Sequence, residues 1–520
     1  MQLNGWCRLA VTLGLLCCLP AAARAEWHEA SGPNFLIYAD QSEKQVREFT
    51  DMLERYRSAM RFLYKLPEEQ TSPSNRLTVF VVRDASQVRK LLGDGSRYTQ
   101  GFYQSRAGGS VAFIPRVDGS GQSERVTEGE LILLHEYAHH FMYSAFSGSA
   151  PLWFTEGFAE FFASAKFEKD GSVGLGLPAR HRSVELLYAK NVPLDLLVNT
   201  RKYRETASKS YDAFYGRSWL LFHYLMLSDK RPGQLASYLA RLSKGEGEEA
   251  AATNAFGDLS VLDKEIGRYL QTRKMNYINL RASKVSSGPI AIRPLRAAEA
   301  AILPVMMRSK RGVDKEQAAT VVEEARTVAA AYPDDAFVLT ALAEAEFDAG
   351  HEDAAIAAAE RAIALDPAAI NARIQKIYAL FRKAEDDSSD KLWPEVRTAV
   401  ASANRIENDN PIPLSFFFRT YAAEGKTPPP VAIQGLEKAL MLAPYDTGLR
   451  LTLGRYYIRK GDSEAARQTL DPLLNHPHNT ALADIARKLL AAEDAVPDDT
   501  PTGDTQAGDT GADDTNASQP

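Results

Sequence analysis

The segment of this chain with the clearest chemical potential is His135-Glu136-Tyr137-Ala138-His139, in which two histidines lie four residues apart. On an α-helix this spacing puts both imidazoles on one face, where they can bind a single metal ion. Two neutral nitrogen ligands suit Zn²⁺, and Glu136, about 100° around the helix from His135, is placed to accept a proton from a zinc-activated water molecule. We therefore predict a hydrolytic zinc site. The alternative is a pair of surface histidines on a helix.

A second acidic pair follows in an aromatic segment, Trp153–Phe162, which contains Glu156 and Glu160. A buried carboxylate is costly unless it is paired or bound to a metal, so Glu156 needs a reason to be there. A catalytic zinc binds three protein ligands and keeps one open position. We therefore predict Glu156 as the third zinc ligand, beside His135 and His139.

These two motifs, H-E-x-x-H and W-x-x-E-G-x-A-E, resemble those of the gluzincin metallopeptidases, such as aminopeptidase N and its smaller peptidase-MA-like relatives. The resemblance implies that Glu156 ligates zinc. It also implies that Glu160 hydrogen-bonds a zinc histidine from outside the coordination sphere, although a solvated surface glutamate is equally compatible with the pattern. The separation of His139 and Glu156 is shorter than in the aminopeptidases, and no G-x-M-E-N motif is present. These departures favour a minimal relative and leave exopeptidase activity in doubt.

A third similarity lies at Phe214-Tyr215-Gly216-Arg217-Ser218, which resembles the aminopeptidase segment P-Y-E-K-G. In that family the tyrosine stabilises the tetrahedral intermediate, and the resemblance assigns this role to Tyr215. A phenol near the zinc can donate to the developing oxyanion. Ser218 replaces the family's glycine. Tyr211, one turn earlier, is an alternative donor, and simple core packing of Tyr215 is another interpretation.

The elements around these motifs predict an α+β domain, because strands come first and helices follow. Strands are expected at 34–38, 77–82, 102–104 and 110–114, and a mainly helical region at 127–280. Thr127 and Glu130 form a capping-box signature at the start of the motif helix. With the resemblance, this region is expected to be a zincin-like catalytic domain over residues 26–284. If 110–114 edges the sheet, it could align an extended substrate by strand addition.

The C-terminal half is built differently. Residues 285–300 carry Gly and Pro and are expected to be a linker, and residues 301–485 an all-α domain. Segments 336–367 and 447–478 have small residues, Gly and Ala at matching offsets and resemble the tetratricopeptide repeat, with a weaker copy near 411–444. Such repeats would present a concave surface to a protein or peptide partner. A generic alanine-rich bundle is the alternative.

The two ends of the chain complete the picture. Of 520 residues, the three cysteines, Cys7, Cys17 and Cys18, all lie in an N-terminal segment with the features of a signal peptide, 1–25. A mature chain without cysteine fits export to a bacterial periplasm, with lipid anchoring through Cys17 or Cys18 as the alternative. No later apolar run is long enough to span a membrane. The acidic segment 490–520 is expected to be disordered, and the body of the chain lacks the basic excess of a nucleic-acid binder.

Together these patterns predict an exported zinc metallopeptidase that hydrolyses peptide bonds, with a repeat domain that binds a protein or peptide partner. Two alternatives stay open. One is a catalytically inactive zincin-like and repeat scaffold, which is disfavoured because Glu136 is present although metal binding does not need it. The other is a zinc hydrolase of another amide, such as cell-wall peptide, since the motifs specify the attack and not the acyl group.

Overall fold

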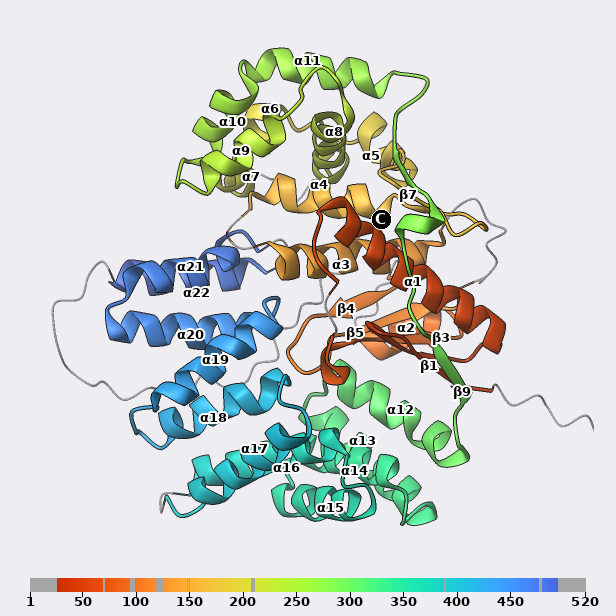
Figure 1. Ribbon diagram of the computed structural model, residues 1–520, viewed down its shortest axis with the longest axis vertical. Coiled ribbons are helices and arrows are strands. Elements are labelled where there is room, and N and C mark those ends of the chain that lie inside the picture. The colour runs from red at the N-terminus through yellow and green to blue at the C-terminus, as the bar shows by residue number, and fades with distance from the viewer. Residues whose placement is uncertain are drawn as a thin grey trace, which may run out of the picture.

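The computed structural model describes residues 26–68, 71–93, 99–117, 126–146, 148, 150–206, 211–387, 390–476 and 479–493, and the structural statements below concern these residues (Figure 1). The expected signal peptide, 1–25, and the tail beyond residue 493 lie outside them. The tail prediction began at residue 490, but the last helix continues to Glu493. Within the described part of the chain, no helix has both the length and the apolar character that crossing a membrane requires.

A six-stranded mixed sheet supports the N-terminal region, with the strand order β4-β5-β3-β2-β1-β9. Its strands are β1 (His28–Ser31), β2 (Phe35–Ala39), β3 (Leu77–Val82), β4 (Phe102–Gln104), β5 (Val111–Pro115) and β9 (Ala291–Pro294). β2, β3 and β5 run parallel, and the other neighbours are antiparallel. The four strands expected from the sequence are present. However, β5 lies between β3 and β4, so the suggestion that 110–114 edges the sheet is wrong, and β4 is the edge strand on that side.

Helices cover both faces of the sheet because the central strand is apolar on both sides. Val79 and Val81 of β3 belong to the core that includes α1 (Glu43–Leu63) and α3 (Glu128–Ala145). The alternate residues Phe80 and Val82 pack with α2 (Ala85–Leu92) and with α12 (Ala297–Arg311) on the opposite face. Burial of β3 on both faces explains the nearly continuous apolar run at 77–82.

The helical part of this region is built on three helices, in which α3 contacts α4 (Leu152–Ala163) and α4 contacts α8 (Phe214–Leu227). Gly157 permits the close approach of the last two, since a Cβ there would lie 2.5 Å from the Ser218 carbonyl oxygen. The smaller elements are β6 (Lys166–Phe167), β7 (Val173–Leu175), β8 (Ile278–Leu280), α5 (Ser183–Tyr188), α6 (Leu194–Leu197), α7 (Thr200–Thr206), α9 (Gln234–Leu242), α10 (Glu248–Phe256) and α11 (Leu259–Leu270).

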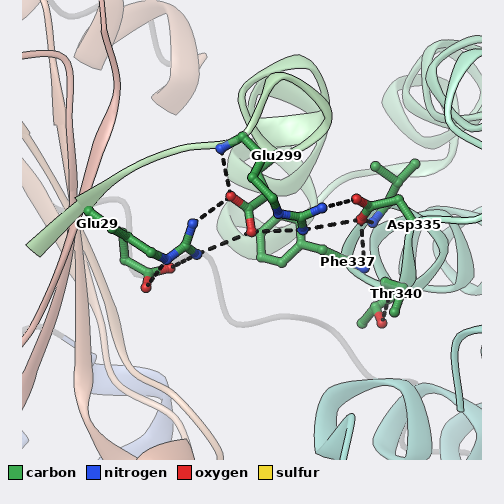
Figure 2. A network of polar contacts seen from close by, with 9 residues as sticks. Glu29, Glu299, Asp335, Phe337 and Thr340 are labelled. Carbon is green, nitrogen blue, oxygen red and sulfur yellow. Dashed lines mark hydrogen bonds and ion pairs between the residues drawn. The ribbon is translucent and has the colours of Figure 1, made fainter. Parts of the chain in front are cut away.

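The segment 285–300, expected to be a linker, is part of the fold. Its residues 291–294 form β9, which pairs with β1, and α12 begins at Ala297. Figure 2 shows the polar network behind this junction: Arg293 binds Glu29 of β1 at 2.9 Å and Glu299 of α12 at 2.6 Å. Arg296 extends the network from Glu299 to Asp335 at the start of α14. The Gly and Pro residues that resemble a linker here border a strand instead.

The remaining helices, α13 to α22, form the repeat region. They are α13 (Lys315–Ala331), α14 (Ala336–Asp348), α15 (Glu352–Leu365), α16 (Ile370–Asp386), α17 (Trp393–Ile406), α18 (Pro411–Ala423), α19 (Pro430–Leu442), α20 (Thr447–Lys460), α21 (Ser463–Leu474) and α22 (Thr480–Glu493). Consecutive helices contact one another, and the array curves beneath and beside the sheet (Figure 1). Gly350, Gly425 and Gly461 end helices with φ of 76°, 71° and 67°, the left-handed conformation that favours glycine. Pro430 begins α19, so the proline run near 428–430 starts a helix.

Candidate metal centre

The two motifs lie on α3 and α4, which contact each other. The residues at the start of each helix fix where the helix begins and therefore where its motif lies. Thr127 accepts a hydrogen bond from the Glu130 backbone N–H at 3.2 Å, and the Glu130 carboxylate accepts one from the Thr127 N–H at 2.7 Å. This is the expected capping box, and α3 begins directly after it. α4 begins at Leu152 after Pro151 and is buried along its whole length.

The structure brings together the three expected metal ligands, His135, His139 and Glu156. The Nε2 atoms of the two histidines are 3.1 Å apart. Glu156 Oε2 lies 3.4 Å from His135 Nε2 and 3.5 Å from His139 Nε2. All three side chains are buried. The spacing of the two histidines on α3 and the acid on α4 therefore produces a compact triangle of two nitrogens and one oxygen.

The triangle has the size that zinc requires. Zinc binds histidine nitrogen and carboxylate oxygen at about 2.0–2.2 Å in tetrahedral geometry, which separates neighbouring ligand atoms by about 3.3–3.5 Å. The three observed separations, 3.1, 3.4 and 3.5 Å, lie at or close to this range. Two neutral imidazoles and one carboxylate are also a ligand set that leaves the fourth position open in catalytic zinc sites.

Glu160 contacts the opposite edge of a ligand imidazole, as the resemblance implies. Its Oε1 lies 3.2 Å from His135 Nδ1 and 2.6 Å from Arg182 Nη2, and its Oε2 lies 2.6 Å from His181 Nε2. Burial alone would raise the pKa of Glu160, but Arg182, His135 and His181 hold that pKa well below its usual range. A carboxylate that accepts a hydrogen bond from Nδ1 leaves the lone pair of Nε2 on the side of His139 and Glu156. Glu160 is therefore not a solvated surface residue.

The charge balance of the centre favours a cation. Burial lowers the pKa of His135, but the carboxylates of Glu156 and Glu160 outweigh burial and raise that pKa to about 10. The same two carboxylates that favour a proton on this imidazole would favour a divalent metal ion between the ligands.

Glu136 directly follows the candidate ligand His135 on α3. Its side chain is half-buried, between the buried neighbours His135 and Tyr137. The Glu136 charge contributes to raising the pKa of Tyr103 on the edge strand β4, after the larger effect of burial. Within the described residues no ion pair to Glu136 is formed, in contrast to Glu160. Glu136 thus follows the candidate ligand His135 on the same helix, and among the described residues no basic side chain forms an ion pair with its carboxylate.

Of the two tyrosine candidates, the structure places Tyr215 near the centre and Tyr211 away from it. Burial raises the pKa of Tyr215 well above its usual value, and the charges of Glu156 and Glu160 contribute. The Arg182 guanidinium lies 4.8 Å from the Tyr215 ring centroid. Tyr211 is 55% exposed, and the causes of its raised pKa are burial and the charge of Glu185, opposed by Arg182, with no contribution from Glu156 or Glu160.

Three residues that the sequence reasoning missed or set aside belong to this centre: His181, Arg182 and Glu185. His181 and Arg182 contact Glu160 directly. Glu185 joins them through Arg182, whose Nη1 lies 3.4 Å from Glu185 Oε2, and Glu185 Oε1 accepts the Gly216 N–H at 2.6 Å. No motif marks them, since they reach the site through a turn and short helix after α4. His223, interpreted as a core residue, does have core partners, the Gly176 carbonyl and the Tyr269 hydroxyl, both at 2.9 Å.

Comparison with known families gives two partial matches. Residues 430–491 match the tetratricopeptide repeat. The C-terminal region contains tetratricopeptide repeats. Residues 132–246 match a family described as a protein of unknown function, DUF1570, and this range contains all the candidate site residues. Tetratricopeptide repeats present extended surfaces to other proteins, so the repeat region suggests a protein-interaction scaffold with a protein partner.

Two of the solved structures with similarity to part of the chain are the following. TTC0263, a thermophilic tetratricopeptide-repeat protein of Thermus thermophilus, is 18% identical, covering 38% of this chain and 100% of its own with a TM-score of 0.31. The pilF protein of Pseudomonas aeruginosa is 17% identical, covering 38% of this chain and 88% of its own with a TM-score of 0.30. No curated protein matches the chain.

Proposed function

We propose that this protein is a zinc-dependent peptidase with a gluzincin-like, zincin-type catalytic domain. The observation that carries the proposal is the buried triangle of His135 Nε2, His139 Nε2 and Glu156 Oε2, whose sides of 3.1–3.5 Å suit zinc. Glu136, the neighbour of His135 on α3, favours a catalytic over a structural metal site, because metal binding alone does not need a further carboxylate.

When bound, zinc would polarise the substrate carbonyl and make a water molecule acidic. Glu136 accepts the proton of the attacking water and later donates a proton to the leaving amine. Tyr215 donates its hydroxyl hydrogen to the oxygen that becomes negative during attack. Glu160, itself held by Arg182 and His181, fixes the His135 ring with Nε2 facing the metal position.

The proposed substrate is a peptide or protein, delivered or selected with the help of the repeat region. The same chemistry would hydrolyse another amide, such as cell-wall peptide, and the experiment below distinguishes these acyl groups. An inactive scaffold is the remaining alternative, supported by the tetratricopeptide match at 430–491. The signal-peptide features of residues 1–25, together with the lack of cysteine from residue 26 onward, support export to a bacterial periplasm as part of the proposal.

The test is a peptide-library digest by the zinc-loaded full chain, compared with Glu136→Gln. Glutamine keeps the size of the side chain but cannot accept the proton of the water, so turnover should fall by about 10²–10⁴ or more while zinc stays bound. Glu128→Gln is the matched control, because Glu128 is an exposed acid in the first turn of the same helix.

Cleavage by the intact protein and the control, with loss in Glu136→Gln, would support the peptidase. Hydrolysis of cell-wall peptide without cleavage of the library would identify the protein as a hydrolase of cell-wall peptide and refute a general peptidase. Full activity of Glu136→Gln on a substrate that the intact protein cleaves would refute the mechanism.

A further inference from the structure

The turn between β4 and β5, residues 105–110, packs against helices of the repeat region. Ala107 is buried and belongs to the same apolar cluster as Ile377 of α16 and Ile412 of α18. The Ala107 backbone N–H donates to Asp446 Oδ2 at 2.6 Å, at the start of α20. A Cβ on Gly108 would lie 2.6 Å from Ile412 Cγ1, which shows how closely the turn fits. The turn of one region therefore fills a site formed by the helices of the other.

Charge complementarity accompanies this fit. Arg106 of the turn donates a hydrogen bond to the Lys310 carbonyl of α12. Burial and the neighbouring Glu344 charge raise the pKa of Asp348, at the end of α14, to about 7, and the positive charges of Lys310 and Arg106 oppose this rise. The turn thus brings a cation toward an acidic pair on the helices that surround it.

A second contact holds the adjoining loop to the same helices. Glu407 accepts hydrogen bonds from the Ser74 backbone N–H at 2.9 Å and from the Ser74 hydroxyl at 2.5 Å. The Asn75 side-chain amide donates to the Leu442 carbonyl at 3.3 Å. Ser74 and Asn75 lie in the short turn before β3, so two loops of the sheet are bound by the repeat region.

These contacts lead to the metal-binding helix. The Tyr103 hydroxyl, on edge strand β4, lies 2.6 Å from His140 Nδ1, and His140 directly follows the ligand His139. The His140 ring also packs against Tyr445, with ring centroids 4.1 Å apart. Tyr445 is the neighbour of Asp446 in the repeat region. His140 is therefore enclosed by the edge strand on one side and by the repeat region on the other.

We propose that the repeat region is an intramolecular clamp on the metal centre. The 105–110 turn occupies the surface of the repeat region formed by Ile377, Ile412 and Asp446. Tyr103 and Tyr445 are positioning residues that hold His140 and hence the part of α3 that carries the candidate ligands. Because the turn is tethered, its effective concentration is high, and a protein partner that occupies this surface must first displace it. Partner binding would then loosen α3 at the ligands. The effect on hydrolysis rests on the proposed function, whereas the mechanical coupling does not.

The test is hydrogen exchange measured by mass spectrometry on the full chain, comparing the intact protein with Asp446→Asn. Asp446 Oδ1 caps α20 by accepting the Leu449 N–H at 2.7 Å, and asparagine can still do this. Asparagine cannot also accept the Ala107 N–H, so the bond between turn and repeat is lost specifically. Asp462→Asn is the matched control, since Asp462 caps α21 without contacting the turn.

We expect exchange about tenfold faster in 102–111 and in the 133–143 part of α3 for Asp446→Asn, with weaker zinc retention, and no such change for Asp462→Asn. Unchanged protection of these two segments in Asp446→Asn, or equal loss in both variants, would overturn the clamp. If Asp446→Asn does not fold, variants of Tyr445 replace it in the test. Tyr445→Phe keeps the ring on His140 and should retain the protection of α3, whereas Tyr445→Ala should lose that protection. Equal protection in these two would overturn the positioning role.

Hydrolysis is measured on the same samples. An intact protein that shows the expected exchange pattern but cleaves no peptide would refute the proposed function and leave the clamp supported. Cleavage of peptide by the intact protein, with no effect of Asp446→Asn on exchange, would support the proposed function and overturn the clamp.

Discussion

Helix α4 of the metal-bearing region and helix α15 of the repeat region bury different kinds of residue. All of Leu152–Ala163 is buried in α4, including the carboxylates of Glu156 and Glu160. In α15 the buried residues are the four alanines Ala355, Ala358, Ala359 and Ala362. Alanine lets neighbouring helices approach closely at little entropic cost, whereas a buried carboxylate is tolerated when a cation compensates it. The first helix therefore buries charge that must be compensated, and the second buries only small apolar side chains.

A sharper contrast is between two buried acids, Glu156 in α4 and Glu346 in α14. Glu346 is compensated within the repeat region by Arg326, with both carboxylate oxygens 2.7 Å from guanidinium nitrogens, and by His351 at 2.9 Å. Glu156 Oε2 lies 3.4 Å from His135 Nε2 and 3.5 Å from His139 Nε2. Glu346 is thus paired with an arginine, whereas Glu156 contacts two imidazoles, and the proposed function adds a metal ion between them.

The largest effect we expect is that of Glu156→Ala, which should reduce hydrolysis to background and remove zinc from the centre. Three-ligand sites bind zinc far more weakly when one ligand is lost. Glu346→Ala, which deletes the compensated acid, should lower the stability of the repeat region and leave zinc and hydrolysis in place. Metal analysis and a peptide-cleavage assay on both variants provide the check, and a similar loss of zinc in both would erase the contrast.

Tyr215→Phe should follow, with a loss of about 10²–10³ in kcat and a smaller change in KM, because the oxyanion exists only after attack. Tyr211→Phe is its control, since Tyr211 is largely exposed. Steady-state kinetics of both variants measure the effect. A silent Tyr215→Phe beside a crippled Tyr211→Phe would transfer the role to Tyr211.

Glu160→Gln should have an intermediate effect and weaken zinc binding by about 10–100-fold, since the negative partner of the His135 imidazole is lost. Titration with a competing chelator measures the affinity. An unchanged zinc affinity would reduce Glu160 to a structural partner of Arg182.

Glu185→Gln should give the smallest effect, on stability. Burial raises the pKa of Glu185 to about 7 in the folded protein, so the folded state holds this proton more tightly than the unfolded chain does. The resulting stabilisation is fully present below about pH 4.5 and is lost as the pH rises through 7. Relative to the intact protein, Glu185→Gln should gain about 1–3 kcal/mol between pH 5 and pH 8, measured by denaturant unfolding. A difference that does not vary with pH would contradict this.

What could be predicted from the sequence depended on how local the signal was. The pair His135 and His139 follows from helical spacing, and the helix start from Thr127 and Glu130. Glu156 stands out because a carboxylate in an aromatic helix is unusual. The glycines and alanines of the repeat region likewise carry a periodic signal, and the match at 430–491 agrees with the tetratricopeptide prediction there.

Contacts between distant segments left no such signal. Ala107 and Asp446 are 339 positions apart, and the donor is a backbone N–H that any residue could provide. Arg182 reaches Glu160 from 22 positions away, outside any motif. The order of β4 and β5 in the sheet, and the pairing of 291–294 with β1, also depend on tertiary packing rather than on local pattern.

The central claim, that His135, His139 and Glu156 form a zinc site, is tested most directly by metal analysis of the intact full chain beside His139→Ala after identical zinc loading and dialysis. The account predicts one zinc per chain in the intact protein and a loss of most of it in His139→Ala. Substoichiometric zinc that His139→Ala does not change would contradict the account, since the metal would then be bound elsewhere.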